Sequence, residues 1–162
     1  MILTNLFATI GITITLLSGT TLDVNNQTTI SNFQNMTSVA TQVCTDLELD
    51  NVNIVLFGSN DTFEIEQDGA KQTIIGNMYK GFWVIGSNTI YLNVDKNDLN
   101  TTVHELRHMW QYENGLFVNY IYASLTNLKA YRRQPLEQDA RAFASAYLNN
   151  ETCDYVNLMV EN

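Results

Sequence analysis

The chain of 162 residues has a single proline, two cysteines and only eight lysine and arginine residues. One proline leaves little room for a flexible linker, so we expect one folded domain. The net charge is −9 without any basic cluster, which disfavours nucleic acid and anionic membrane surfaces as partners. The apolar runs are short and contain many threonines, so no stable membrane span is expected.

The two cysteines, Cys44 and Cys153, are more than a hundred residues apart and form neither a CxxC metal-binding pair nor a disulfide-rich framework. Cys44 falls on the apolar stripe of a predicted helix, which favours a buried free thiol. A disulfide with Cys153 is the alternative in an oxidising compartment.

The N-terminal segment, residues 1–27, is apolar and allows two interpretations. Its threonines alternate with isoleucines, as in a β-strand. The alternative is a secretory signal peptide, but the segment has no lysine or arginine and no small-x-small site ending in alanine. We therefore favour an intracellular location over export through an atypical signal, and expect a single domain over residues 28–162.

After residue 27 the hydrophobic pattern changes from a helix to strands and back to helices. Apolar residues at helical spacing predict a helix at 28–48. Short β-branched and aromatic stretches, separated by turn residues, predict a small, mostly antiparallel sheet. These stretches lie at 52–57, 62–66, 72–75, 78–85 and 88–94. Later helices are predicted in the segment that contains residue 104, at 117–131 and at 135–149. The predicted fold class is therefore α+β.

The only histidines are His104 and His108, and with Glu105 they form the zinc-metallopeptidase motif HExxH. Four residues are about one helical turn, so a helix directs both imidazoles to one side, where they can take two positions of a zinc tetrahedron. Glu105 points about a hundred degrees further round, which suits a general base acting on water better than a ligand. The spacing predicts a catalytic metal site.

An apolar stripe independently predicts that the motif lies on a helix. The stripe consists of Leu99, Val103, Leu106 and Trp110. We expect Asp95 or Asn97 to cap the start of this helix and Gly115 to end it.

A catalytic zinc normally has three protein ligands and one open position, so a third donor is needed. Glu137 and Asp139 follow Pro135, which suits the first turn of a helix. They lie two residues apart and project to nearly opposite sides, so only one is expected to reach the metal. Glu137 shares its face with the small residues Ala140 and Ala144, which favours Glu137 and leaves Asp139 as the alternative.

The two motif segments resemble the compact gluzincin-type metallopeptidases, among them the ImmA/IrrE-type proteases and related bacterial and phage proteins with HExRHxxQ cores. The matching stretches are residues 104–111, HELRHMWQ, and 137–144, EQDARAFA. Arg107 stands where the ImmA/IrrE pattern usually has glycine, and Arg141 where it often has asparagine. These departures bear on the subfamily and its substrates and leave the ligand positions unchanged.

The resemblance implies that His104, His108 and Glu137 bind zinc, and that Glu105 is the general base in peptide-bond hydrolysis by a metal-activated water. It also implies a zincin-like fold, in which the sheet packs on the HExxH helix and substrate adds to an edge strand, here 88–94. The predicted function is that of a zinc-dependent metallopeptidase acting on a peptide or protein.

A noncatalytic zincin-fold module that binds a protein partner, with a structural or lost metal, is the alternative function. Glu105 favours the enzyme, because a structural site needs no general base. The lack of an obvious oxyanion donor favours the alternative. The available groups are Tyr112, Tyr131, Tyr147, Arg132 and Arg141. Arg141 follows Glu137 by one turn and is also a candidate to orient its carboxylate.

Overall fold

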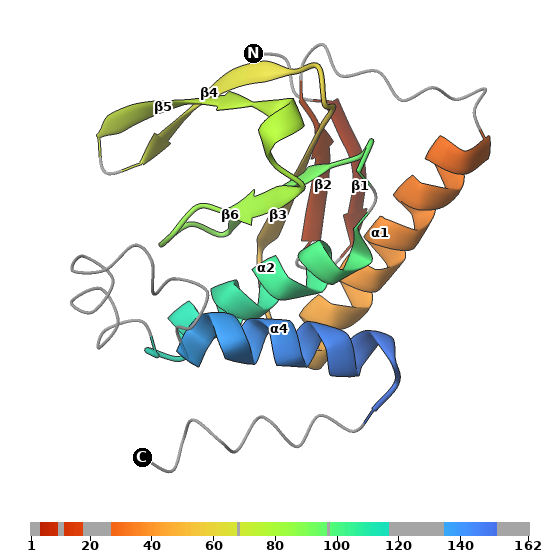
Figure 1. The fold of residues 1–162 in the computed structure, drawn as a ribbon, viewed down its shortest axis with the longest axis vertical. Helices are drawn as coiled ribbons and strands as arrows, with labels where there is room; N and C mark the ends of the chain where they lie inside the picture. Colours follow the sequence, from red (N-terminus) through yellow and green to blue (C-terminus); the bar gives the residue numbers. More distant parts are fainter. Residues whose placement is uncertain are drawn as a thin grey trace.

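The computed structural model describes residues 4–9, 12–17, 27–67, 69–96, 98–116 and 135–151. The fold is α+β, with a five-stranded sheet, a separate two-stranded hairpin and helices packed on one another and on the sheet (Figure 1). The strands of the main sheet, in spatial order, are β1 (Thr4–Thr9), β2 (Ile12–Leu16), β3 (Val52–Phe57), β7 (Thr89–Asn93) and β6 (Gly81–Trp83). The hairpin consists of β4 (Thr62–Gln67) and β5 (Ala70–Ile75), followed by the 3-10 turn η1 (Gly76–Met78). The helices are α1 (Gln27–Asp46), α2 (Leu99–Glu113) and α4 (Pro135–Leu148).

The main sheet is mixed, so the prediction of a mostly antiparallel sheet is wrong. The pairs β2–β3 and β3–β7 are parallel, whereas β1–β2 and β6–β7 are antiparallel. Parallel neighbours need a long crossover connection, and α1 lies between β2 and β3 in the chain. Local alternation predicts that a segment is a strand but does not encode the direction of its neighbour.

Most predicted elements occur close to their expected positions. The predicted strand at 52–57 is β3, and the predicted helix at 28–48 is α1. The stretch 78–85 is strand only at Gly81–Trp83, because its beginning belongs to η1. The helix predicted at 117–131 lies outside the described residues. Strands β1 and β2 fall in the segment 1–27, and β2 pairs with β3.

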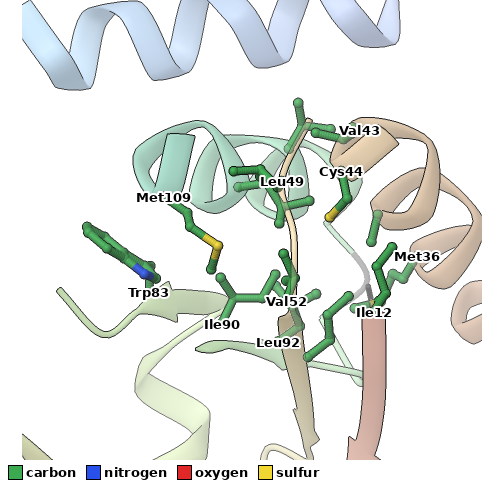
Figure 2. Packing of buried hydrophobic residues seen from close by; sticks show 14 of the residues in the cluster. Ile12, Met36, Val43, Cys44, Leu49, Val52, Trp83, Ile90, Leu92 and Met109 are labelled. Carbon is green, nitrogen blue, oxygen red and sulfur yellow. The ribbon is translucent and has the colours of Figure 1, made fainter. Parts of the chain in front are cut away.

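The main core lies between the sheet and the helices. Figure 2 shows Val52, Ile90 and Leu92 of the central strands between Met109 of α2 and Cys44 of α1. Cys44 is a buried free thiol, as predicted, and burial together with the charge of Glu113 raises its pKa to about 12. Cys153 lies outside the described residues.

The N-cap of helix α2 lies one residue after Asn97, the later of the two expected caps. The cap is Asp98, whose Oδ1 accepts a hydrogen bond from the Thr101 backbone N–H at 3.2 Å. The prediction of Asp95 is wrong, because its carboxylate instead accepts from the Ser59 backbone N–H at 2.6 Å. Asn97 lies outside the described residues. Gly115 ends the helix as predicted, since its φ of 74° is in the left-handed region that glycine adopts without strain.

Asp98 also joins α2 to the sheet, because its Oδ2 accepts from Nζ of Lys80, the residue before β6, at 2.7 Å. Burial opposes ionisation, but the Lys80 ammonium and the Thr101 hydrogen bonds outweigh it and hold the pKa of Asp98 below its ordinary value. A lowered pKa in the folded state means that the contribution of this carboxylate is present at neutral pH and is lost as the pH falls through the carboxyl range.

We expect Asp98→Ala to lower the free energy of unfolding by about 1 kcal/mol at pH 7, because it removes the helix cap. The difference from the wild type should shrink below pH 4. Urea denaturation followed by circular dichroism measures both effects. Glu64→Ala is the control, since it removes only an exposed ion pair with Lys71. A difference between wild type and variant that is independent of pH would contradict this account.

Candidate metal centre

The two halves of the predicted site meet where α2 and α4 pack side by side (Figure 1). His104 and His108 project from the middle of α2, and Glu137 projects from the first turn of α4. Nε2 of His108 lies 3.0 Å from Nε2 of His104 and 3.0 Å from Oε1 of Glu137. Nε2 of His104 lies 3.6 Å from Oε2 of Glu137. Among the described residues, this is the one group of three donors able to hold a metal ion.

The spacing of these donor atoms suits zinc. Two ligands at about 2.0–2.1 Å from a tetrahedral zinc lie about 3.3 Å apart. Nε2 of His108 lies 3.0 Å from Nε2 of His104 and from Oε1 of Glu137, and Nε2 of His104 lies 3.6 Å from the other carboxylate oxygen, Oε2, so these distances are close to that value. Two imidazoles with one carboxylate are also a zinc donor set, whereas calcium and magnesium prefer oxygen ligands. The group therefore fits zinc in both donor type and spacing.

Electrostatics keep the His104 ring in the form that binds a metal. Burial and the charge of His108 lower the pKa of His104 to about 4, so this imidazole is neutral at pH 7. Burial also opposes protonation of His108, but its hydrogen bond with Glu137 and the charge of Glu105 outweigh burial and raise the pKa of His108. Arg141 donates to Oε2 of Glu137 at 3.2 Å and so contacts the carboxylate on the side away from His108.

Glu105 lies between the metal-binding group and the edge of the sheet. Its Oε2 accepts a hydrogen bond from the backbone N–H of Trp83, in β6, at 3.0 Å. Burial, and to a smaller degree the charge of Glu137, raise the pKa of the Glu105 carboxyl to about 7. A carboxyl group with a pKa near the working pH has the acidity expected of a general base.

The strand beside this carboxyl is a different one from the strand expected. Residues 88–94 were predicted to be the edge strand, but β7 lies between β3 and β6. The two edge strands of the sheet are β1 and β6, and α2 packs against β6. The prediction is wrong because it assumed that the last strand in the chain is also the last in space.

Asp139, the alternative third donor, lies on the other side of α4 and binds Arg107. The Nε and Nη2 atoms of Arg107 donate to Oδ2 and Oδ1 of Asp139 at 2.8 and 3.2 Å. The guanidinium also stacks 3.9 Å from the ring centroid of Trp110 and 4.7 Å from that of Phe143. Arg107, one of the two residues that depart from the ImmA/IrrE pattern, therefore has a buried partner.

Gln111 was not predicted as part of the site, but its Oε1 lies 2.8 Å from Nδ1 of His108. A signal was present, because Gln111 follows His108 by three residues and so shares its face of α2. The hydrogen bond from the backbone N–H of Trp83 to Glu105 had no such signal in the sequence, since it depends on how the strands of the sheet pair.

The proposed oxyanion donors have separate locations. Tyr112 lies one turn after His108, and its ring packs 5.5 Å from that of Trp83. Tyr147 donates to Oδ2 of Asp46, on α1, at 2.5 Å. Tyr131 and Arg132 lie outside the described residues. Of the candidates in the described part of the chain, Tyr112 and Arg141 lie next to members of the site.

The chain matches no protein-family model, no curated protein and no solved structure. None of the helices in the described ranges combines the length and apolarity needed to cross a membrane.

Proposed function

We propose that the chain is a zinc-dependent metallopeptidase of zincin-like fold. The observation that carries this proposal is a three-donor group, His104, His108 and Glu137, with a fourth ionisable side chain, Glu105, close by. Structural zinc sites are closed by four protein ligands, whereas catalytic sites have three and an open position. A structural site also has no use for a buried carboxyl group that is not a ligand.

In this proposal the two histidines and Glu137 hold the metal. When bound, zinc supplies polarisation of a substrate carbonyl and makes water more acidic. Glu105 accepts the proton from water on its carboxylate and returns it to the leaving amine. The backbone N–H of Trp83 fixes one oxygen of this carboxylate, which leaves the other oxygen to exchange the proton. Arg141 orients Glu137 through Oε2.

The position of β6, the strand of the main sheet next to Glu105, supports a peptide as the substrate class. Lys80 and Val84 exchange backbone hydrogen bonds with β7, through Asn93 N–H to Lys80 O and Val84 N–H to Thr89 O. Antiparallel pairing alternates, so Gly81 and Trp83 direct their backbone groups away from β7, toward the side of Glu105. In this proposal an extended peptide lies along β6 beside the general base, where the Trp83 N–H already donates to Glu105.

Elemental analysis of the purified protein tests the proposal. We expect about one zinc per chain after reconstitution at neutral pH, and its loss in Glu137→Ala. Glu66→Ala, which removes an exposed carboxylate on the β4–β5 hairpin, is the control and should keep the metal. No zinc in the wild type would favour the noncatalytic module with a lost metal.

A further inference from the structure

Gln111 is fully buried beside the metal-binding group, and the direction of its side-chain amide is decided by its neighbours. Its nitrogen donates to the backbone carbonyl of Leu136 at 3.0 Å and to Oδ2 of Asp139 at 2.7 Å. The Leu136 carbonyl is an acceptor only, and both Asp139 oxygens already accept from Arg107. The amide nitrogen must therefore face these groups, and the amide oxygen must face His108.

This orientation decides which nitrogen of His108 carries a proton. An amide oxygen only accepts hydrogen bonds, so Nδ1 of His108, 2.8 Å away, is the donor and holds a hydrogen. The other ring nitrogen, Nε2, is then the one directed at His104 and Glu137, each 3.0 Å away. A neutral imidazole with its proton on Nδ1 has its lone pair on Nε2, which is the arrangement that a metal ligand needs.

Arg107 and Asp139 hold Gln111 in turn. Asp139 binds Arg107 with both oxygens and shares Oδ2 with Gln111. The Arg107 side chain is 1% exposed and its guanidinium lies against the rings of Trp110 and Phe143, so it has little room to move. A series of hydrogen bonds therefore joins Arg107 of α2 to Asp139 of α4. Asp139 in turn accepts from Gln111 of α2, which contacts the ring of His108.

We propose that Gln111 is the positioning residue of this metal centre. It holds His108 with the proton on Nδ1 and Nε2 toward His104 and Glu137, while Arg107 and Asp139 hold Gln111 itself. The inference rests on the proposed function for the metal, whereas the hydrogen bond from Nδ1 to Gln111 is also a property of the metal-free protein, in which the Glu137 carboxylate, an acceptor, faces Nε2. Partners of this kind change metal affinity by about 10–100-fold.

Zinc affinity, measured by competition with a chromophoric chelator, tests the proposal with two variants. Gln111→Met keeps the volume but has no acceptor, and we expect its Kd for zinc to rise about 10–100-fold. Gln111→Glu keeps an oxygen acceptor for Nδ1 and should stay closer to the wild type. A role in packing alone predicts the reverse order, because glutamate puts a charge next to Asp139. That reverse order would overturn the proposal. Gln42→Met, on the exposed face of α1, is the control.

Nitrogen-15 spectra of labelled histidine give a second readout that needs no metal and no variant of Gln111. With two histidines in the chain, only two rings appear, and His104→Gln assigns them. At a pH at which the His108 ring is neutral, the metal-free wild type should show its proton on Nδ1, and a neutral ring with no proton on Nδ1 would overturn the proposal. If the wild type binds no zinc, the proposed function fails, and this spectrum still decides whether Gln111 orients His108.

Discussion

Glu105→Gln is expected to keep about one zinc per chain and to lose at least about 100-fold in the rate of peptide hydrolysis. The amide oxygen of glutamine can still accept the hydrogen bond from the Trp83 backbone N–H, so the side chain keeps its position. It can no longer take a proton from water, which removes general-base catalysis while the three donor atoms are untouched. The measurement is cleavage of a fluorescent casein substrate by the zinc-loaded protein, with metal content determined on the same sample.

Glu113→Gln is the matched control, because it makes the same change at the exposed end of the same helix. It should retain both zinc and activity. If Glu105→Gln hydrolyses the substrate as fast as the wild type, the metallopeptidase proposal fails and any activity belongs to another site or a contaminant. The noncatalytic module would then be the better account of the zinc group.

Asp139→Ala is expected to lower the free energy of unfolding by about 3–5 kcal/mol, because it leaves the charge of Arg107 buried without a carboxylate. Arg107 is 1% exposed, and its Nη1 is the one buried side-chain nitrogen or oxygen in the described part of the chain that lacks a hydrogen-bond partner. The other two guanidinium nitrogens, Nε and Nη2, both donate to Asp139. A loss of this size is a large part of the total stability of a typical domain. Urea denaturation of the metal-free protein measures it.

The double variant Arg107→Met/Asp139→Leu separates the buried charge from the packing. Replacing both partners by apolar side chains removes the unpaired charge, so we expect it to recover most of the stability lost in Asp139→Ala. A loss below about 1 kcal/mol in Asp139→Ala would contradict the burial of this ion pair, since only exposed pairs contribute so little.

The elements of the fold were largely predictable because their signals are local. Helical spacing of apolar residues within a few turns predicted α1 and α2, and β-branched stretches between turn residues predicted β3 and β7. The strand order was not predictable, because pairing joins segments far apart in the chain, and alternation is the same for parallel and antiparallel neighbours. The identity of β6 as the edge strand beside Glu105 depended on that order.

At the candidate site, contacts within one helical turn were also predictable, and contacts between helices were not. The proximity of His104 to His108 follows from their spacing of four on a helix, and the opposite directions of Glu137 and Asp139 follow from their spacing of two. Local spacing did not show that Glu137 meets the histidines while Asp139 meets Arg107, or that Gln111 contacts both helices. These contacts exist because α4 packs on α2, and such packing brings together residues some thirty positions apart, whose partners no local pattern specifies.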